Sequence, residues 1–233
     1  MTEGKAMKKA LFWDFDGTLI YGEPSFLNAL RSALCLRGYS VPDAEIQACL
    51  NTGCSWHTPE ISYAARVGER WWVDLFAHFG LLYEKFRIPI EEASAINAAF
   101  KKEILDPATY CLYPDAKRVL RDCIELGFSN YVLSNNFPEL QTVAERLGFG
   151  GLIKSYIVSS AIGYEKPRLE IFRYAMNVAG NPDCCYMIGD NPVGDIRGGK
   201  SAGMTTILVH QQGDCPADYR YETLLEIPSI LER

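Results

Sequence analysis

The sequence lacks the features that mark several large classes of protein. No stretch approaches the roughly 18 consecutive apolar residues that a membrane-spanning helix requires. The polar start, Met1 to Lys5, has no apolar signal region. Lys and Arg form no dense run beyond the short segment from Lys5 to Lys9, and acidic residues outnumber basic ones by 29 to 23. We therefore expect a cytoplasmic protein that binds neither a membrane nor a nucleic-acid polymer.

Cysteine patterns typical of metal sites or disulfide frameworks are also absent. The eight cysteines include no C-x-x-C pair, and no histidine lies at metal-site spacing from them. Most fall within apolar helical or strand patterns, which predicts small buried hydrophobic residues in a reducing compartment. A chain of 233 residues, 48% of them hydrophobic, can bury a core without disulfides, in one large or two smaller domains.

A short buried strand that ends in two acids is the most informative stretch. The apolar run Ala10 to Trp13 leads directly into Asp14-Phe15-Asp16-Gly17-Thr18. Because side chains alternate along a strand, Asp14 and Asp16 are expected to project to one side and Phe15 to the other. Two such carboxylates either share a proton or hold a cation, and oxygen ligands favour a hard ion such as Mg²⁺. Two solvated acids at a strand end are the alternative interpretation.

The next part of the chain has the pattern of helices throughout. Apolar residues at helical spacing predict helices that begin at Pro24 and Pro42, a helix around Trp72–Phe79 that stops at Gly80, and another over Ala93–Leu105. The segment Asn51–Pro59 is expected to be a polar loop that carries one large aromatic residue and one histidine. No segment between Pro24 and Leu105 has the pattern of a strand.

From Tyr113 onward, helix and strand patterns alternate, which is typical of a parallel sheet covered by helices. Strands are expected at Tyr131–Leu133, Tyr156–Val158, Cys185–Ile188 and Thr206–Val209, and helices at 114–126, 138–147 and 169–179, with a short helix within 217–231. We predict an α/β fold with a Rossmann-like parallel-sheet core, residues 1–21 and 110–233, that has helices on both faces. An all-helical cap domain, residues 22–109, is inserted after the first strand.

Three further polar clusters follow predicted strands. Ser134 and Asn135 close the second core strand before a helix, a position that suits either a bound anion or a simple helix cap. Lys166 precedes a helix start, where a cation is disfavoured unless an anion pairs with it, although a solvated lysine is the simpler interpretation. Asp190 ends a strand and Asp195 follows five residues later, a spacing that lets both reach one cavity.

Together these residues resemble the four motifs of the haloacid dehalogenase-like hydrolase superfamily, in the subgroup with a helical cap between motifs one and two. Asp14-Phe15-Asp16-Gly17-Thr18 is similar to motif one, Leu133-Ser134-Asn135 to motif two, Lys166-Pro167 to motif three, and Gly189-Asp190 with Asp195 to motif four. Each motif alone is a weak signal, but four in the family's order are a strong one. The resemblance implies a Mg²⁺-dependent phosphatase that acts on a small phosphorylated metabolite.

The resemblance also implies catalytic roles. Asp14 would attack phosphorus and form an aspartyl-phosphate. Asp16 would protonate the leaving alkoxide and then deprotonate the attacking water. Ser134, the backbone at Asn135 and Lys166 would bind the phosphoryl oxygens and offset their charge.

The implied metal ligands are Asp14, the backbone carbonyl of Asp16, and Asp190, around a Mg²⁺ ion. Asp195 would support this group by orienting Lys166 or a metal-bound water. The expected substrate-binding residues are Thr18, Asn135, Trp56 and His57.

Alternatives remain open within and outside the superfamily. Dehalogenases lack the second acid of motif one, so Asp16 argues against them. Phosphonate-cleaving relatives use a lysine from the first cap helix, where this chain offers only Arg31 and Arg37. Phosphomutases hold a second phosphate with basic cap residues, whereas residues 38–65 contain no Lys or Arg. A non-catalytic binding module could keep every motif residue without the activity.

The missing cations also bear on the substrate. A neutral or aromatic leaving group, such as a nucleoside or a small alcohol, would suit a cap that presents Trp56 and His57. An equally good interpretation makes Trp56 a packing residue of the cap and His57 an ordinary loop residue. His78 and His210 are interpreted as ordinary residues, and we expect a monomer or a homodimer.

Overall fold

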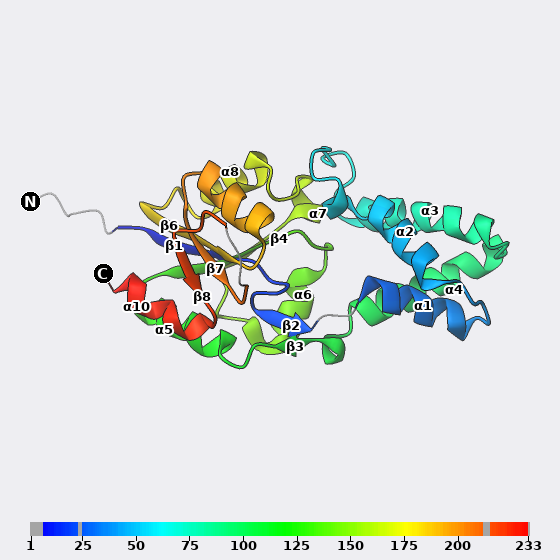
Figure 1. Cartoon of the computed structure of the whole chain (residues 1–233), viewed down its shortest axis with the longest axis horizontal. Coiled ribbons are helices and arrows are strands. Elements are labelled where there is room, and N and C mark those ends of the chain that lie inside the picture. The colour runs from blue at the N-terminus through cyan, green and yellow to red at the C-terminus, as the bar shows by residue number, and fades with distance from the viewer. Residues whose placement is uncertain (1–6, 23–24, 212–214, 233) are drawn as a thin grey trace, which may run out of the picture.

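A parallel six-stranded sheet forms the centre of the protein (Figure 1). The computed structural model describes residues 7–22, 25–211 and 215–232. Every neighbouring pair in the sheet is parallel, in the order β5-β4-β1-β6-β7-β8. The strands are β1 (Lys9–Trp13), β4 (Ser129–Ser134), β5 (Ser155–Val158), β6 (Cys184–Gly189), β7 (Thr205–Val209) and β8 (Tyr219–Tyr221). Taken in chain order this is the Rossmann arrangement, with its switch point between β1 and β6.

Helices cover both faces of the sheet, as the alternation within β1 requires. Leu11 and Trp13 are buried in one hydrophobic cluster, and Ala10 and Phe12 in a second one. The first cluster takes residues from α5 (Ala116–Glu125), α6 (Leu140–Ala144) and α10 (Pro228–Leu231). The second takes residues from α8 (Leu169–Val178), which packs beside α9 (Gly198–Ser201), and Ile162 of α7 (Ser159–Ile162) packs against the same cluster. The predicted α/β class is therefore confirmed.

Two of the predicted core elements differ from the structure. The α-helix expected over 138–147 is shorter in the structure. It begins at Leu140 and ends at Ala144, and a π-helical turn follows at Glu145–Phe149. The short helix predicted within 217–231 is found as α10, but Tyr219–Tyr221 also forms the edge strand β8, followed by a 3₁₀ turn at Leu224–Glu226. A three-residue, largely exposed edge strand pairs through its backbone, so its side chains give little signal.

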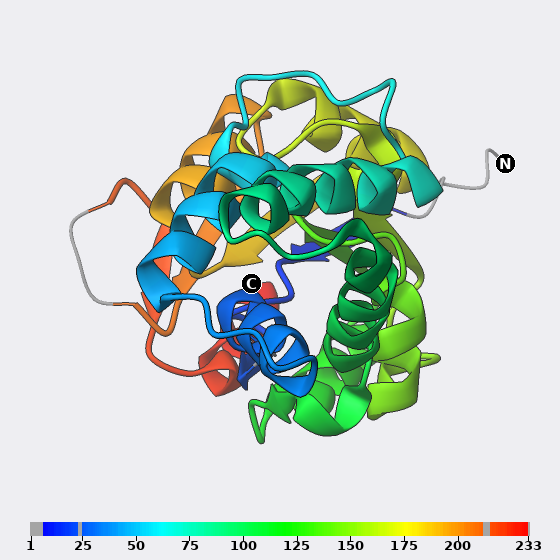
Figure 2. The same cartoon turned by 90° about the vertical axis from the view of Figure 1, so that its right-hand side faces the viewer.

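A helical segment lies between β1 and β4 in the chain and forms the other end of the molecule (Figures 1 and 2). It contains α1 (Phe26–Leu36), α2 (Asp43–Gly53), α3 (Glu69–Lys85), α4 (Ile90–Ile104) and 3₁₀ turns at Ser55–His57 and Pro107–Thr109. In the chain, β2 (Ile20–Gly22) precedes the segment and β3 (Cys111–Leu112) follows it, and these two strands pair as an antiparallel ribbon. No strand occurs among the described residues of the segment, 25–110. Its division from the core as a domain of residues 22–109 remains a prediction.

The bounds of these helices correct two expectations. A third prediction, that α1 begins at Pro24, falls on a residue outside the described ones. Asn51 to Gly53 form the last turn of α2 rather than part of a loop. Gly80 lies inside α3, which runs on to Lys85. A glycine costs a helix about 1 kcal/mol relative to alanine. The burial of Leu82 and Tyr83 beyond Gly80 offsets that cost.

The helical segment contacts the core through several polar groups. The indole N–H of Trp72 in α3 donates to Glu139 at 2.7 Å, and Lys101 of α4 pairs with the same carboxylate at 2.7 Å. The backbone N–H groups of Tyr63 and Gly68 donate to the carbonyls of Gly163, which caps α7, and of Ser160 within α7. These contacts fix the segment over the carboxyl-terminal edge of the sheet.

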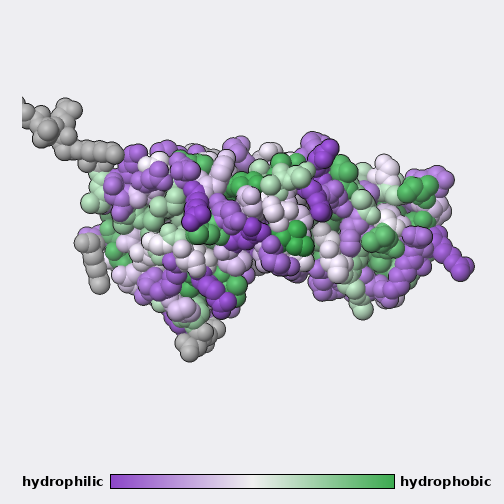
Figure 3. Space-filling model, turned by 90° about the horizontal axis from the view of Figure 1, so that it is seen from above, coloured by the Kyte–Doolittle hydropathy of each residue, from purple (hydrophilic) through white to green (hydrophobic). Residues whose placement is uncertain are grey.

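Two further expectations concern membranes and cysteines. Among the described residues, no helix combines the length and apolar character needed to cross a bilayer. The face shown in Figure 3 mixes hydrophilic and hydrophobic residues over both ends of the molecule. All eight cysteines are free, and Cys49, Cys54, Cys123 and Cys215 are buried. The predicted burial is wrong for Cys35 and Cys111, which are exposed.

Candidate active site

The segments that follow β1, β4 and β6 begin at the same edge of the sheet, because β1 pairs with β4 on one side and with β6 on the other. Trp13 at the end of β1 lies opposite Val132 of β4 and Ile188 of β6. Asp14, Ser134 and Asp190 therefore emerge together, with the Asp14 N–H bonded to the Ile188 carbonyl at 2.8 Å. Asp14 and Ser134 are buried, with 8% and 1% of their surfaces exposed.

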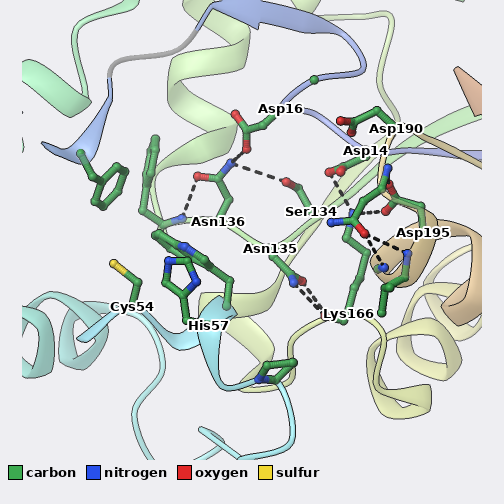
Figure 4. A pocket seen from close by; sticks show the side chains of 18 of the residues that line it. Asp14, Asp16, Cys54, His57, Ser134, Asn135, Asn136, Lys166, Asp190 and Asp195 are labelled. Atoms are coloured by element: carbon green, nitrogen blue, oxygen red, sulfur yellow. Dashed lines mark hydrogen bonds and ion pairs between the residues drawn. The ribbon is translucent and has the colours of Figure 1, made fainter. Parts of the chain in front are cut away.

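A cavity of about 730 Å³ lies above this edge, between the core and the helical segment. Most of the predicted site residues line it: Asp14, Asp16, Trp56, His57, Ser134, Asn135, Lys166, Asp190 and Asp195. Thr18 does not. It is fully buried beneath the cavity, and its hydroxyl donates to Asp190 at 3.4 Å. In Figure 4, Asp14, Asp190 and Asp195 gather beside Lys166, whereas Cys54 and His57 lie across the cavity.

Lys166 joins two of the carboxylates. Its Nζ lies 2.9 Å from Asp14 Oδ1 and 2.6 Å from Asp195 Oδ1, and the lysine is only 4% exposed. Burial disfavours the ammonium form, but the charges of Asp14 and Asp195 outweigh it and raise the pKa of Lys166. The lysine is therefore a charged member of a buried ion-pair group and not the solvated side chain of the simpler interpretation.

Asp14, Asp190 and Asp195 lie so close together that ionising all three carboxyl groups at once is unfavourable. Burial and the nearby charge of Asp14 raise the pKa of Asp190 to about 6. Burial also raises the pKa of Asp195 above its usual range, and the ion pair with Lys166 opposes that rise. Carboxylate oxygens of Asp14, Asp190 and Asp195 lie within 4.8 Å of one another. Such a group of acids suits a bound cation.

Gly17 lets the motif-one turn pass close to this group. Its φ of +73° lies in the left-handed region, and a Cβ there would come within 2.5 Å of Asp190 Oδ2. Only glycine fits that position without displacing the carboxylate.

Asp16 lies in the same cavity, but its side chain is directed away from the other acids (Figure 4). Its Oδ2 accepts a hydrogen bond from Asn136 Nδ2 at 2.5 Å. Asn136 is 6% exposed, and its Oδ1 accepts from the Phe137 N–H at 2.9 Å, which turns the amide NH₂ toward Asp16. Its own N–H donates to Ser159 Oγ at 3.1 Å. Sequence reasoning missed Asn136; its place directly after Ser134-Asn135 was the one available signal.

Asn135 uses its side chain to hold the lysine loop. Its Oδ1 accepts from the Lys166 N–H at 2.6 Å, and its Nδ2 donates to the Lys166 carbonyl at 3.0 Å. The expectation that Ser134 and Asn135 sit at a helix start is wrong, because α6 begins only at Leu140. Any anion here would meet loop N–H groups rather than a helix terminus.

A second residue that sequence reasoning missed links the lysine loop to the helical segment. Glu165 is 2% exposed, and its Oε1 accepts from Ser55 Oγ at 2.5 Å. The Trp71 indole N–H donates to the same hydroxyl at 3.2 Å. Ser55 begins the 3₁₀ turn that carries Trp56 and His57. The segment facing the cavity is thus fastened next to Lys166.

His210 is more closely involved than expected. Its ring stacks on Tyr113 with centroids 3.7 Å apart, and Nε2 lies 3.2 Å from the Thr18 carbonyl. The interpretation of His210 as an ordinary residue after a strand is therefore incomplete, since it supports the motif-one turn from below.

The fold and this site place the chain in the class of Rossmann-like α/β proteins that carry an acidic cluster at the switch point of the sheet. Residues 8–203 match the family model of haloacid dehalogenase-like hydrolases, and the chain belongs to this hydrolase family.

Several named proteins are similar to this chain. Phosphoserine phosphatase from Thermus thermophilus is 33% identical over 146 residues, an alignment that covers 61% of this chain and 56% of that protein. The chain therefore spans little more than half of that relative. Haloacid dehalogenase-like hydrolase domain-containing protein 3 from Xenopus laevis is 24% identical over 87% of this chain and 84% of its own length. Pyrimidine 5'-nucleotidase YjjG from Escherichia coli is 40% identical, but over only 32% of this chain and 35% of its own.

Solved structures agree on the fold. The HAD-hydrolase YfnB from Bacillus subtilis, bound to magnesium, superposes with a TM-score of 0.69 at 19% identity, covering 97% of this chain and 100% of that one. A 2-haloacid dehalogenase from Pseudomonas syringae gives 0.70 at 21% identity, covering 97% and 98%.

Proposed function

We propose that the protein is a Mg²⁺-dependent phosphatase that hydrolyses a small phosphomonoester through an aspartyl-phosphate on Asp14. The observation that carries this proposal is the pairing of Asp14 with Lys166 at 2.9 Å, in a cavity that also contains a second motif-one acid, Asp16. The names of three relatives support it: a phosphoserine phosphatase, a pyrimidine 5'-nucleotidase and a glyceraldehyde 3-phosphate phosphatase.

In the first step, an Asp14 oxygen forms a bond to phosphorus while the bond from phosphorus to the alcohol oxygen breaks. Asp16 gives its proton to the departing alkoxide. In the second step a water attacks phosphorus, Asp16 takes the proton from that water, and the bond to Asp14 breaks. Ser134 and the loop N–H groups near Asn135 bind phosphoryl oxygens, and Lys166 offsets their charge.

The acids fit the hard cation that this family chemistry implies. Asp14, Asp190 and Asp195 offer clustered oxygen ligands, and among the described cavity-lining residues Lys166 is the only Lys or Arg to balance them. Asp14 and Asp190, with the Asp16 carbonyl, would hold Mg²⁺, and Asp195 would support Lys166. When bound, the ion reduces repulsion between the Asp14 carboxylate and the phosphoryl oxygens.

Two competing functions within the superfamily suit the residues less well. A halide leaves without a proton, so a dehalogenase has no use for Asp16. A phosphomutase must hold a second phosphate, and the cavity has no Lys or Arg on its helical side among the described residues. Hydrolysis of a single phosphomonoester uses both motif-one acids and needs no cation on the helical side.

The experiment is phosphate release from p-nitrophenyl phosphate, with and without Mg²⁺, by the wild type and by Asp14→Asn. We expect activity only with the metal, and a loss of at least about a thousandfold in the variant. Asp43→Asn, the same substitution at an exposed position of α2, should retain wild-type activity. Equal activity of Asp14→Asn and the wild type would refute the nucleophile. Inactivity of the wild type across a broad panel of phosphate esters would favour a binding module.

A further inference from the structure

The cavity has two chemically different ends. The end at the sheet edge carries the carboxylates and Lys166. The opposite end is formed by the helical segment and by Phe137 of the core, and it includes the large apolar side chains of Leu27, Leu50, Trp56 and Phe137. A phosphoryl group at the first end would direct its alcohol toward the second.

The second end has no side chain of the four strongly charged types among the described residues. Gln47 and His57 are among its polar groups, and no Lys, Arg, Asp or Glu occurs among the described residues that line it. Lys166, the one Lys or Arg among the described residues that line the cavity, is already paired with Asp14 at 2.9 Å and with Asp195 at 2.6 Å. A charged alcohol would therefore lose water without gaining a partner of opposite charge, which is strongly unfavourable. A carboxylate would in addition face the repulsion of the site's own acids.

The apolar wall is held in place before any substrate binds. Trp56 stacks on Trp71 at 5.8 Å between centroids and meets the edge of Phe26 at 5.3 Å. The turn that carries Trp56 is fastened by the hydrogen bond from Ser55 to Glu165. A rigid aromatic wall binds flat apolar groups at little cost in conformational entropy. A cavity of about 730 Å³ is also far larger than a small aliphatic alcohol needs.

We propose that this site selects phosphomonoesters whose alcohol is uncharged and carries a flat aromatic ring, a class that includes aryl-methyl and nucleoside phosphates. It discriminates against alcohols that carry a carboxylate, an amino-acid group or a second phosphate. The inference rests on the phosphatase activity proposed above and adds to it the chemistry of the leaving group. It also assigns Gln47, which sequence reasoning did not single out, to the specificity wall.

The test for charge compares two esters of equal shape, 4-carbamoylbenzyl phosphate and 4-carboxybenzyl phosphate, by kcat/KM in the presence of Mg²⁺. We expect the neutral amide to be preferred by about tenfold or more. Gln47 is exposed in α2, so Gln47→Lys should fold normally, and it supplies the missing cation. We expect this variant to reduce the preference severalfold by improving the carboxylate substrate, whereas the neutral control Gln47→Met should keep it.

The test for the ring compares 4-carbamoylbenzyl phosphate with ethyl phosphate. Trp56→Ala should lower the preference for the ring about tenfold, and Trp56→Phe should largely keep it. Equal use of the two benzyl esters, preference for the carboxylate, or an unchanged ring preference in Trp56→Ala would overturn the inference while leaving the phosphatase activity intact. Failure of the wild type to hydrolyse any of the esters would overturn the proposed function itself, and the inference with it.

Discussion

Asn136→Ala should selectively impair reactions in which the leaving group must be protonated. In the structure, Asn136 Nδ2 donates to Asp16 Oδ2, and the Phe137 N–H fixes the orientation of the amide. Without this donor the Asp16 carboxyl loses a contact that holds it in the position from which it serves the alcohol oxygen. Lys166 keeps its contacts with Asp14 and Asp195. Ser134 loses only the long contact from Asn136 Nδ2 to its Oγ, at 3.5 Å.

The size of the effect follows from the kind of hydrogen bond that is lost. A hydrogen bond to a charged group is worth about 1.5–3 kcal/mol. Each 1.36 kcal/mol corresponds to about tenfold in rate, so the expected loss is roughly 10- to 100-fold in kcat/KM. This loss should appear with benzyl phosphate, because a benzyl alkoxide is too basic to leave unprotonated. With p-nitrophenyl phosphate, whose phenolate leaves without a proton, the change should be no more than about threefold.

The assay measures kcat/KM for both esters in the wild type, Asn136→Ala, Asp16→Asn and the double variant. Since Asn136 acts through Asp16, the double variant should be no slower on benzyl phosphate than Asp16→Asn alone. Asn177→Ala, at an exposed position of α8, serves as the control for the substitution itself. An equal loss on both esters, or a loss that adds to that of Asp16→Asn, would show that Asn136 does not position the acid.

Two other predictions concern stability. Burial raises the pKa of Glu165 above its ordinary 4.5, so the folded protein loses stability as the pH rises through the folded pKa. The unfolding free energy of Glu165→Gln, measured in urea, should therefore increase relative to that of the wild type between pH 5 and pH 8. A difference that does not change with pH would contradict this. Phe100 is fully buried against four rings of the helical segment, so Phe100→Ala should lower the free energy of unfolding by about 3–5 kcal/mol. Ile90 lies in the same helix but is 76% exposed, so the control Ile90→Ala should change the free energy of unfolding by no more than about 0.5 kcal/mol.

The parts of the fold that were predicted correctly depend on local patterns. The strand that ends at Trp13 and the acids that follow it are contiguous in sequence, and parallel strands with covering helices force their ends to one edge. The strand β8 could not be predicted in the same way, because it is held by backbone pairing to β7. Gly80 misled the helix prediction, since packing of later residues in α3 outweighs its weak helix propensity.

The contacts that sequence reasoning missed join residues that are far apart in the chain. Asn136 and Asp16 are separated by 120 residues, and Glu165 and Ser55 by 110. Neither asparagine nor serine is unusual in a loop, so nothing local distinguishes them from capping or solvated residues. Only the register of β1 beside β4, and the docking of the 3₁₀ turn at Ser55 on the lysine loop, brings these pairs together.

A shortage of positive charge connects the two ends of the cavity. Lys166 is the only Lys or Arg among the described residues that line it, and it is shared by Asp14 and Asp195. At the sheet edge this leaves a surplus of carboxylate charge, which an incoming phosphate would oppose unless a divalent cation intervened. At the other end the same shortage leaves nothing to pair with a second anion on the substrate. The proposed dependence on a metal and the proposed preference for an uncharged alcohol therefore have one physical origin, and adding a cation at Gln47 should relax the second without removing the first.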